Sequence, residues 1–529
     1  MGTAFFGAIN YSSANGTYSN CYYDSSKIIN PNDSNASEIN SKTTSDLCSP
    51  DSNILSNWSK AASRYPLPNI VATDSSEGIS ELVWNEICEL AKVDTSSSGS
   101  SGTATGITYA GTDSTSSLPK FYITTAEGLA TFRDMVNGTL LDDTLTSYTI
   151  SADSSVTGIA DYSITTSAAL TNISGVLQAD IDLSGIEEWI PIGNADFPFE
   201  GSFDGQNKTI SNLTISNATT ENQGLFGVFD CSLSDEKRCL SNICVTGSIT
   251  TSSPYVGGLV GQATNIVFQN CENYIAINSS SETVGGLVGQ ADTCDFIGCT
   301  NYADIISTSS AIYNLCVGGI AGLITDVTAE YCYNAGDISA NMSVGGIFGF
   351  EQSSSISYPT IEYCVNTGVI TGSSYYGGIV GYANKALSLG YCANYGEITY
   401  SGNDDNLENG FILGGCSSSN KTLATKILSV GKSSSIGTAL TNPTYYAVSK
   451  NASVTYSYYD SDKLTDIQGL SSNGGGDALS TSELINGTIL DNFYYGDWNY
   501  QTGRYPIPNL KDNISAVAWN LLVSTVSEQ

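Results

Sequence analysis

Carboxylates are the residues of this chain whose spacing best suits catalysis. The 529-residue sequence contains no histidine, which excludes Ser-His-Asp and Cys-His catalysis and any histidine-ligated metal. Asp180 and Asp182 alternate along an expected strand and so share one of its faces, and Asp204 follows in the same region of the pattern. Paired carboxylates about 5 to 9 Å apart can hydrolyse glycosides. A carbohydrate-binding or carbohydrate-cleaving protein that uses these acidic residues is therefore one interpretation.

Cysteines are the second group with chemical potential, and 14 are present. Five recur in a Cys-x-Asn element, at Cys271/Asn273, Cys299/Asn301, Cys332/Asn334, Cys364/Asn366 and Cys392/Asn394. If these copies stack, their parallel Cβ vectors disfavour disulfides, and a straight column offers no tetrahedral cluster for zinc. We expect buried thiols that pack as small apolar residues. The pairs Cys21–Cys48 and Cys231–Cys239 lie outside the column and are better disulfide candidates.

A glycine-rich element alternates with the Cys-x-Asn element and determines the fold. Its starts are 28, 33, 27 and 32 residues apart. The copies are Val256-Gly-Gly-Leu-Val-Gly261, Val284-Gly-Gly-Leu-Val-Gly289, Val317-Gly-Gly-Ile-Ala-Gly322, Val344-Gly-Gly-Ile-Phe-Gly349 and Tyr376-Gly-Gly-Ile-Val-Gly381. The apolar runs are too short for helices and fit buried strands. One coil cannot bury its own apolar face, but stacked coils can.

The period therefore predicts an all-β parallel β-helix, or β-solenoid, with coils of about 27 to 33 residues and short capping or linking helices. Equivalent strands of neighbouring coils pair at about 4.8 Å. Identical residues then lie above one another, so Asn273, Asn301, Asn334, Asn366 and Asn394 should form a hydrogen-bonded ladder beside the inward-pointing cysteines.

The glycine copies resemble the GLUG-motif repeats of bacterial cell-surface, adhesin-like proteins, a motif also found in immunoglobulin A-specific zinc metallopeptidases. The region before them resembles the usual opening of such arrays, in Gln178-Ala-Asp-Ile-Asp-Leu-Ser-Gly185, Trp189-Ile-Pro-Ile-Gly193 and Phe199-Glu-Gly-Ser-Phe-Asp-Gly205. The resemblance covers about residues 120 to 420. It implies a parallel β-helix and a secreted or wall-attached location, and it makes Asp180 and Asp182 parts of a scaffold motif. It implies little about activity.

The sequence pattern divides the chain into four segments. Residues 119–430 should form the solenoid, with a capping helix at about 125–137 whose start is marked by Thr124 and Glu127. Residues 93–118 are a Ser/Gly/Thr linker. Residues 431–529 form a C-terminal tail module, and residues 1–92 resemble it.

The likeness of the two ends extends over several motifs. Tyr22-Tyr-Asp matches Tyr458-Tyr-Asp, Thr44-Ser-Asp-Leu matches Thr481-Ser-Glu-Leu, and the Trp58 to Ile70 segment matches the Trp498 to Leu510 segment. An amphipathic helix is expected after Trp84 and after Trp519, the latter using Ile514, Val517, Leu521 and Leu522. We therefore expect the chain to be part of a tandem array, or a filament subunit whose two ends are built alike.

The net charge and the apolar runs of the chain limit which partners it can bind. With 52 acidic and 18 basic residues, the formal net charge is −34, which disfavours nucleic acid. No run of 18 apolar residues occurs, so we expect no membrane insertion in this segment. No cofactor is indicated, although the acidic surface could hold Ca²⁺. We expect an extracellular structural or adhesive module and not an enzyme, whose partner is another copy or unit of itself, or a host or cell-surface glycan or protein.

Overall fold

The computed structural model describes residues 100–528 and four short strands before them. Within 100–528 it does not describe 114–115, 142–144, 217, 219, 235, 311–314, 353–358, 402–407, 418–421, 436–443, 451, 465–475 and 487–492. The chain divides into two compact units, Met1–Ser101 with Asp142–Ser147, and Gly102–Leu141 with Tyr148–Gln529. The predicted pair Cys21–Cys48 and the helix predicted after Trp84 lie outside the described residues.

In the first unit the structure describes two strand pairs. Strand β1 (Tyr22–Asp24) pairs in parallel with β2 (Asn40–Lys42). Strand β3 (Trp58–Ser59) pairs antiparallel with β4 (Leu67–Pro68), so that Trp58 lies opposite Pro68.

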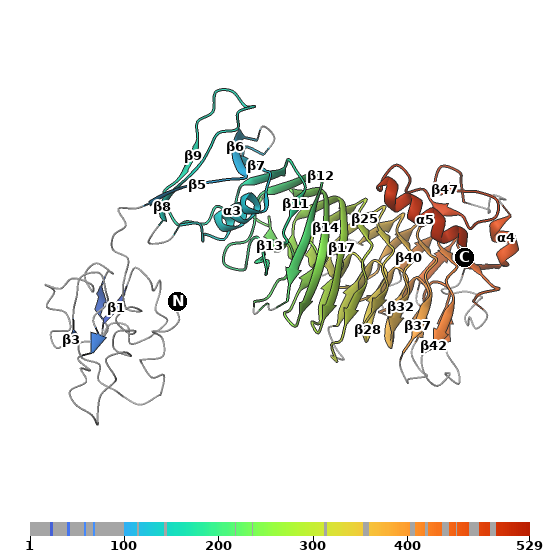
Figure 1. The fold of residues 1–529 in the computed structure, drawn as a ribbon. Coiled ribbons are helices and arrows are strands. Elements are labelled where there is room, and N and C mark those ends of the chain that lie inside the picture. The colour runs from blue at the N-terminus through green and yellow to red at the C-terminus, as the bar shows by residue number, and fades with distance from the viewer. Residues whose placement is uncertain are drawn as a thin grey trace. The chain divides into compact units, whose positions relative to one another are not determined.

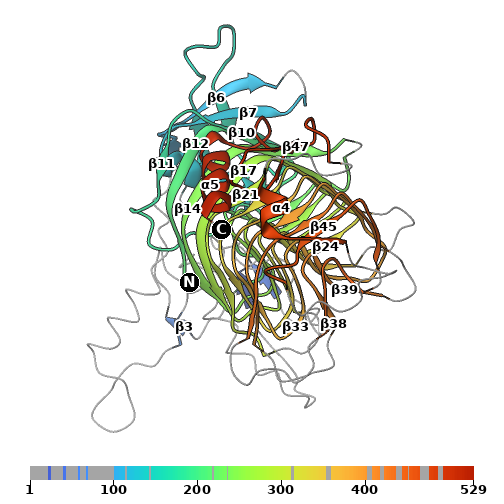
Figure 2. The same ribbon diagram turned by 90° about the vertical axis from the view of Figure 1, so that its right-hand side faces the viewer.

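The second unit confirms the predicted parallel β-solenoid (Figure 1). Viewed from the C-terminal side, the coils lie one behind another around a common interior (Figure 2). A seven-stranded sheet runs along one side, with strands β13 (Phe226–Asp230), β16 (Val260–Thr264), β19 (Val288–Asp292), β24 (Ala321–Thr325), β29 (Phe348–Glu351), β34 (Val380–Ala383) and β39 (Leu413–Cys416). A five-stranded sheet holds β15 (Val256–Gly257), β18 (Thr283–Gly285), β23 (Cys316–Gly318), β28 (Met342–Gly345) and β33 (Ser374–Gly377).

The largest sheet receives up to three short strands from each coil. Its first members are β6 (Ile107–Thr112), β7 (Pro119–Ile123), β10 (Ser174–Leu177), β11 (Ile181–Asp182), β12 (Ser202–Ile215), β14 (Arg238–Thr251) and β17 (Ile266–Ser279). The middle coils contribute β20 (Asp295–Ile297), β21 (Thr300–Asn301), β22 (Ile305–Ser307), β25 (Thr328–Glu330), β26 (Tyr333–Asn334), β27 (Ile338–Ser339), β30 (Thr360–Glu362), β31 (Val365–Asn366) and β32 (Ile370–Gly372). The last members are β35 (Ser388–Gly390), β36 (Ala393–Asn394), β37 (Ile398–Tyr400), β40 (Thr422–Thr425), β41 (Leu428–Ser429), β42 (Ser433–Ser435), β44 (Ala452–Thr455), β45 (Tyr458–Asp460) and β46 (Asp477–Leu479).

Smaller sheets complete the described strands. They contain β5 (Ser100–Thr103), β8 (Leu145–Ile150) and β9 (Tyr162–Ile164), then β38 (Glu408–Gly410) with β43 (Thr444–Tyr446), and β47 (Trp498–Asn499) with β48 (Ile507–Pro508).

The core is built from columns of equivalent side chains. Ile277, Ile305, Ile338, Ile370 and Ile398 lie in register on successive coils and are each at most 2% exposed. Full burial of such a side chain stabilises the fold by about 1.5 to 3 kcal/mol. Phe268 and Phe296 stack in the same way, with ring centroids 4.9 Å apart. The repeat in sequence thus becomes a repeat in packing, and each coil buries the apolar face of its neighbour.

A helix covers the N-terminal end of the interior. Helix α3 spans Ala126–Val136, close to the predicted range, but its N-cap is Thr125 rather than Thr124. The Thr125 hydroxyl accepts a hydrogen bond from the backbone N–H of Gly128. Phe132 of this helix packs edge-on against Phe199 and Phe203 of the first coils. The helix therefore covers apolar side chains that the first coil would otherwise expose.

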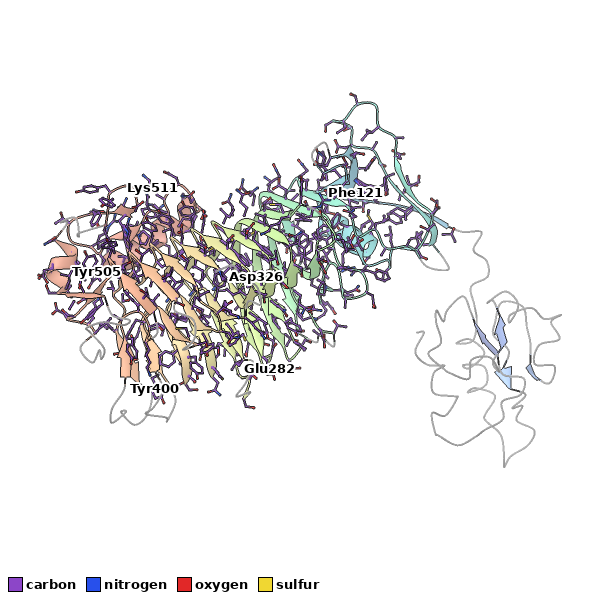
Figure 3. The ribbon with its side chains drawn as sticks, turned by 180° about the vertical axis from the view of Figure 1, so that it is seen from behind. Phe121, Glu282, Asp326, Tyr400, Tyr505 and Lys511 are labelled. Atoms are coloured by element: carbon purple, nitrogen blue, oxygen red, sulfur yellow. The ribbon has the colours of Figure 1, made fainter. Side chains whose placement is uncertain are left out.

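The C-terminal tail docks along the side of the coils. It contains helix α4 (Thr481–Ile485), the β47–β48 hairpin and helix α5 (Ala516–Glu528). In Figure 1 helix α5 lies beside the last coils, and in Figure 3 Lys511 lies at the edge opposite Glu282 and Tyr400. Helix α5 buries Ala518, Leu522 and Val526, whereas Val517 and Leu521 are exposed. Of the four predicted residues, Leu522 and Ile514 are buried, whereas Val517 and Leu521 are not, because the helix packs through an i, i+4, i+8 stripe of Ala518, Leu522 and Val526.

Candidate functional site

The five asparagines of the Cys-x-Asn element form a continuous ladder inside the solenoid. Each is 0% exposed. The amide nitrogen of Asn273 donates to the amide oxygen of Asn301 at 2.8 Å, and the series continues at 2.8, 2.7 and 2.8 Å up to Asn394. The second amide proton of Asn334 goes to the backbone carbonyl of Gly336, 2.8 Å away. Buried amides are thereby supplied with partners, as a dry interior requires.

The glycine element makes room for this ladder. A Cβ atom on Gly258 would lie 2.2 Å from the amide oxygen of Asn273, and one on Gly319 would lie 2.5 Å from that of Asn334. No real Cβ approaches so closely, so the second glycine of each Gly-Gly pair is fixed by the asparagine packed against it.

The five cysteines form a neighbouring interior column. Cys271, Cys299, Cys332, Cys364 and Cys392 are free thiols, all 0% exposed. The Cys271 thiol donates to the carbonyl of Leu240 in the coil before it, at 3.3 Å. Burial raises the pKa of the thiols of Cys271, Cys332 and Cys364. These three thiols therefore stay neutral and pack as small apolar residues. At Cys299 burial also raises the pKa, but hydrogen bonds with Cys271 and Cys332 outweigh it and leave the pKa lowered.

Cys231 and Cys239 are free thiols in this structure. Burial raises the pKa of Cys231 to about 12 and also raises that of Cys239. Desolvation is the main cause of both shifts.

The three aspartates of the glycosidase interpretation bind backbone and amide groups. Asp180 accepts the backbone N–H of Thr209 at 2.9 Å. Asp182 accepts the amide of Asn212 at 2.7 Å, and this bond, with those from Ser184, holds the pKa of Asp182 below its usual range. Such bonds fix loops between coils. Asp182 therefore lacks the raised pKa of a general acid.

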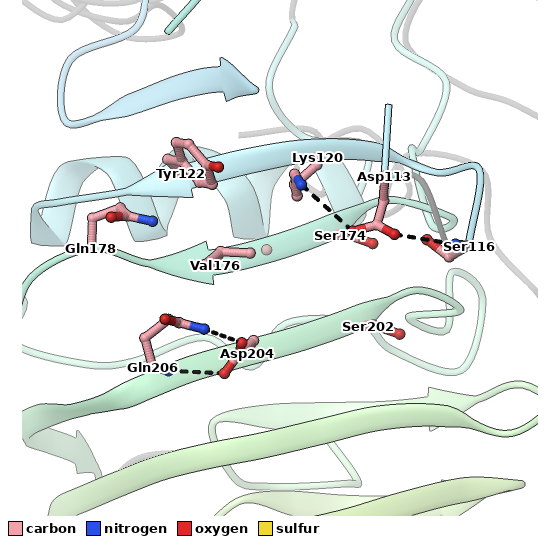
Figure 4. A pocket seen from close by; sticks show the side chains of 11 residues that line it. Asp113, Ser116, Lys120, Tyr122, Ser174, Val176, Gln178, Ser202, Asp204 and Gln206 are labelled. Carbon is pink, nitrogen blue, oxygen red and sulfur yellow. Dashed lines mark hydrogen bonds and ion pairs between the residues drawn. The ribbon is translucent and has the colours of Figure 1, made fainter. Parts of the chain in front are cut away.

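Asp204 lies elsewhere, in a polar pocket that sequence analysis did not find (Figure 4). The pocket has a volume of about 310 Å³ and lies on the outer face of β7, β10 and β12. Two register columns form its floor, Lys120–Ser174–Ser202 and Tyr122–Val176–Asp204. Its rim includes Asp113, Ser116, Gln178 and Gln206. No repeated motif marks these residues, because the pocket spans the irregular first coils.

The pocket combines one aromatic ring with hydrogen-bonding groups of both kinds. Lys120 forms an ion pair with Asp113 at 3.6 Å, and Asp204 accepts the backbone N–H of Gln206 at 2.9 Å and the amide of Asn242 at 3.1 Å. Ser174 is only 4% exposed, and its hydroxyl has no hydrogen-bond partner among the described residues.

The surface that receives the tail is a column of outward-facing residues. The residue between Cys and Asn is polar in the early coils, at Glu272 and Thr300, and apolar in the later ones. In register with them lie Tyr333, Val365, Ala393 and Leu428. These four are buried together with tail residues that include Trp498, Ile507, Leu510 and Leu522. The residue between Cys and Asn thus changes from polar to apolar along the chain. This change indicates where the tail docks, but the sequence analysis did not use it.

A left-handed residue precedes the Cys column in every coil. Asn270 (φ 52°), Tyr331 (φ 58°), Tyr363 (φ 52°), Tyr391 (φ 53°) and Lys426 (φ 55°) occupy this corner. Asparagine tolerates such a backbone, whereas tyrosine and lysine are uncommon there. The rings of Tyr363 and Tyr391 stack with centroids 4.5 Å apart.

The tail binds this stacked column through one charged pair. The Lys426 ammonium lies 3.2 Å from the Asp497 carboxylate and 4.5 Å from the Tyr391 ring centroid. Burial lowers the pKa of Lys426, but bonds to Tyr391 and Asp497 outweigh this effect and leave it raised. Tyr363 donates its hydroxyl to Asp497 at 3.2 Å.

Among the side chains that the structure describes, no three His, Cys, Asp or Glu residues gather where they could hold a metal ion. None of the described helices is both long enough and apolar enough to cross a membrane.

The fold and these surfaces define a β-solenoid with a laterally docked tail. No protein-family model matches the sequence. A stretch of 127 residues, 22% of the chain, is 35% identical to halomucin of Haloquadratum walsbyi and spans 1% of that protein's length. A crystal structure of a candidate immunoglobulin A1 protease from Bacteroides ovatus aligns with 76% of this chain and 94% of its own, at 20% identity and a TM-score of 0.35.

Proposed function

We propose that this chain is a rigid extracellular module of a cell-surface protein, with a structural or adhesive rather than an enzymatic role. It would act as one unit of a tandem array or of a self-assembling filament. The likeness to halomucin, whose name is that of a mucin, supports a surface location. The engagement of Asp180 and Asp182 in structural hydrogen bonds supports a scaffold role for these carboxylates.

The proposal rests on the likeness between the C-terminal tail and the first unit. In the C-terminal tail, Tyr458 of β45 pairs with Asp477 of β46, and Trp498 of β47 lies opposite Pro508 of β48. In the first unit, the matching Tyr22 of β1 pairs with Asn40 of β2, and the matching Trp58 lies opposite Pro68. Similar sequence thus gives the same two strand pairs with the same registers. The described strands of the first unit thus match those of the C-terminal tail, which supports the proposal that residues 1–92 form a second tail.

A tail of this kind needs a solenoid beside it. Trp498 and Ile507 are 0% exposed because the coils cover them, and β45 adds to β41 through Leu428 and Tyr458. By analogy, β1 and the β3–β4 pair of the first unit would add to the side of another solenoid in the same way. In a tandem array that solenoid belongs to a preceding unit. In a filament it belongs to a second copy whose own tail has been displaced, as in domain swapping.

A fusion tests this proposal directly. Residues 102–436 would be placed before residue 1, so that a second solenoid precedes the first tail. We expect backbone hydrogen exchange at Tyr22–Asp24 to slow by at least about tenfold relative to the present chain, since a docked strand exchanges only on opening. The same fusion with Trp58→Ala is the matched control and should lose the protection. Equal exchange with and without the added solenoid would refute the tandem arrangement.

Assembly of the unmodified chain tests the filament form. Negative-stain microscopy and sedimentation of the full chain at rising concentration should show end-to-end species if tails exchange between copies. A chain that stays monomeric, together with a protected fusion, would favour the array over the filament.

A further inference from the structure

We propose that the polar pocket on β7, β10 and β12 is a binding site for a neutral sugar in pyranose form. This inference goes beyond the proposed structural role and does not depend on the tandem arrangement. It assigns a ligand class to the surface lined by Lys120, Tyr122, Ser174, Gln178, Asp204 and Gln206.

The unpartnered Ser174 hydroxyl is the first observation that points to a ligand. Its side chain is 4% exposed and lines the pocket, and among the described residues nothing accepts its proton or donates to its oxygen. Buried hydroxyls almost always have a partner, because an unsatisfied one destabilises the fold. The Ser116 hydroxyl on the rim is also buried, and none of the residues that the structure describes is its hydrogen-bond partner. A bound molecule with hydroxyl groups would satisfy both.

The pairing of groups in the pocket favours a polyhydroxyl ligand. A sugar hydroxyl donates and accepts at once, so it needs acceptors and donors side by side. Asp204 supplies acceptors, the amides of Gln178 and Gln206 supply both kinds, and the Tyr122 ring offers an apolar face next to a hydroxyl. These groups project from parallel strands whose registers are fixed, Tyr122 beside Val176 and Val176 beside Asp204. The site is therefore largely preformed.

The net charge of the pocket favours a neutral sugar over an acidic one. The Lys120 ammonium is already paired with Asp113 at 3.6 Å. Asp204 then leaves the pocket with one negative charge in excess, on a chain whose formal net charge is −34. A uronic or sialic acid would bring a second carboxylate toward Asp204, which costs Coulomb energy without a free cation in the pocket to offset it.

The backbone beside Asp204 supports a built site. Gln206 and Asn207 both have left-handed backbones, with φ of 49° and 58°. Two consecutive residues of this kind outside glycine are uncommon. The Gln206 amide nitrogen donates to Asp204, which holds the side chain at the pocket edge.

Titration of the full chain with methyl pyranosides tests the proposal. The probes are the methyl glycosides of glucose, galactose, mannose and N-acetylglucosamine, followed by saturation-transfer NMR and calorimetry. We expect at least one to bind with a dissociation constant of about 1 to 10 mM, the range of a ligand of this size. Methyl glucuronoside, the acidic partner of methyl glucoside, should bind at least about fivefold more weakly.

Variants separate the pocket from the rest of the surface. Tyr122→Ala should weaken binding at least about tenfold, whereas Tyr456→Ala, which removes a tyrosine 56% exposed elsewhere, should leave it unchanged. Ser174→Ala should weaken binding several-fold while the melting temperature stays equal or rises, since the lost hydroxyl has no hydrogen-bond partner among the described residues. Absence of saturable binding by all four neutral glycosides would overturn the proposal. Binding that both pocket variants retain, or tighter binding of the glucuronoside, would overturn it as well.

Discussion

A Cβ atom on Gly378 would lie 2.2 Å from the Cγ of Asn394. Gly378 follows directly after β33 of the five-stranded sheet, and Asn394 lies in β36 of the largest sheet. The contact therefore crosses the interior of one coil. Four further pairs repeat it, Gly258 with Asn273, Gly286 with Asn301, Gly319 with Asn334 and Gly346 with Asn366. The glycine and Cys-x-Asn elements, which alternate in the sequence, are therefore two halves of one packing arrangement.

Adding a methyl group at this contact should destabilise the solenoid. We expect Gly378→Ala to lower the free energy of unfolding by about 2 kcal/mol or more, because the new Cβ collides with a buried amide that is held on both sides. Gly185→Ala is the matched control, since a Cβ there meets nothing within 4 Å. Urea denaturation of both variants measures the difference. Equal midpoints for the two would contradict the packing argument.

Removing an asparagine from the middle of the ladder should lower the free energy of unfolding more than removing an exposed asparagine. Asn334→Ala leaves the amide nitrogen of Asn301 without its acceptor and the amide oxygen of Asn366 without its donor. At about 1 to 3 kcal/mol for each of the two unsatisfied buried groups, we expect the free energy of unfolding to fall by about 2 to 6 kcal/mol. Asn278→Ala, on an exposed position of β17, should change stability by less than about 0.5 kcal/mol. A similar small effect for both would show that the ladder contributes little.

The ladder illustrates what the sequence allows one to predict. Identical residues at a constant place in a repeat must lie above one another once strands pair in register, so Asn273 to Asn394 could be placed from spacing alone. The pairing of Gly-Gly with asparagine could not, because it joins positions far apart within a coil. The N-cap at Thr125 was missed by one residue, since two adjacent threonines compete for that position.

The buried thiols should make stability depend on alkaline pH. Unfolded thiols ionise near pH 8.5, and burial raises the pKa of Cys271, Cys332 and Cys364 in the folded chain. Their contribution is complete below about pH 8.5 and is lost as the pH rises above it, because the unfolded chain releases its protons first. Each thiol then lowers the unfolding free energy by about 1.4 kcal/mol per pH unit.

Melting curves in reductant at about pH 8 and pH 9.5 check this expectation. The melting temperature should fall between the two values. Cys332→Ala should be less stable at neutral pH but should lose less stability on the same rise, since it lacks one titrating thiol. An unchanged slope in the variant would mean that the column does not titrate as buried thiols.

The Lys426–Asp497 pair should hold the tail on the coils. A double-mutant cycle with Lys426→Ala and Asp497→Ala should give a coupling energy of about 1 kcal/mol, since a cation–π contact with Tyr391 adds to a partly screened ion pair. Lys426→Ala should also speed hydrogen exchange in α5. The pair Lys237–Asp295, at 2.8 Å and about one quarter exposed, joins coils without the tail and serves as the control. Replacing it should leave exchange in α5 unchanged, and equal effects of both pairs on α5 would contradict a specific role for Lys426.

The docking surface of the tail and the polar pocket could not be predicted from the sequence. The tail's own likeness to residues 1–92 was visible, but its docking partner was not, because Tyr333, Val365 and Ala393 differ in type and only their shared outward position reveals them. Tyr122, Ser174 and Asp204 come from three irregular coils with no common motif. Repeats predict what is regular in the structure, whereas these surfaces arise where the repeat changes.

Gly298 lies at the N-terminal limit of the surface on which the tail docks. It holds the left-handed corner that other coils give to asparagine or tyrosine, and a Cβ there would lie 2.2 Å from the carbonyl oxygen of Asn513. Up to the coil that contains Gly298, the outward column is polar at Glu272 and Thr300; in the later coils, from Tyr333 on, it is apolar and covered by the tail. Duplication or loss of a coil before Gly298 would leave the covered surface intact, whereas a coil gained after it would expose an apolar stripe. Proteins built on this plan can therefore evolve in length from their N-terminal side while their C-terminal coils stay fixed in number.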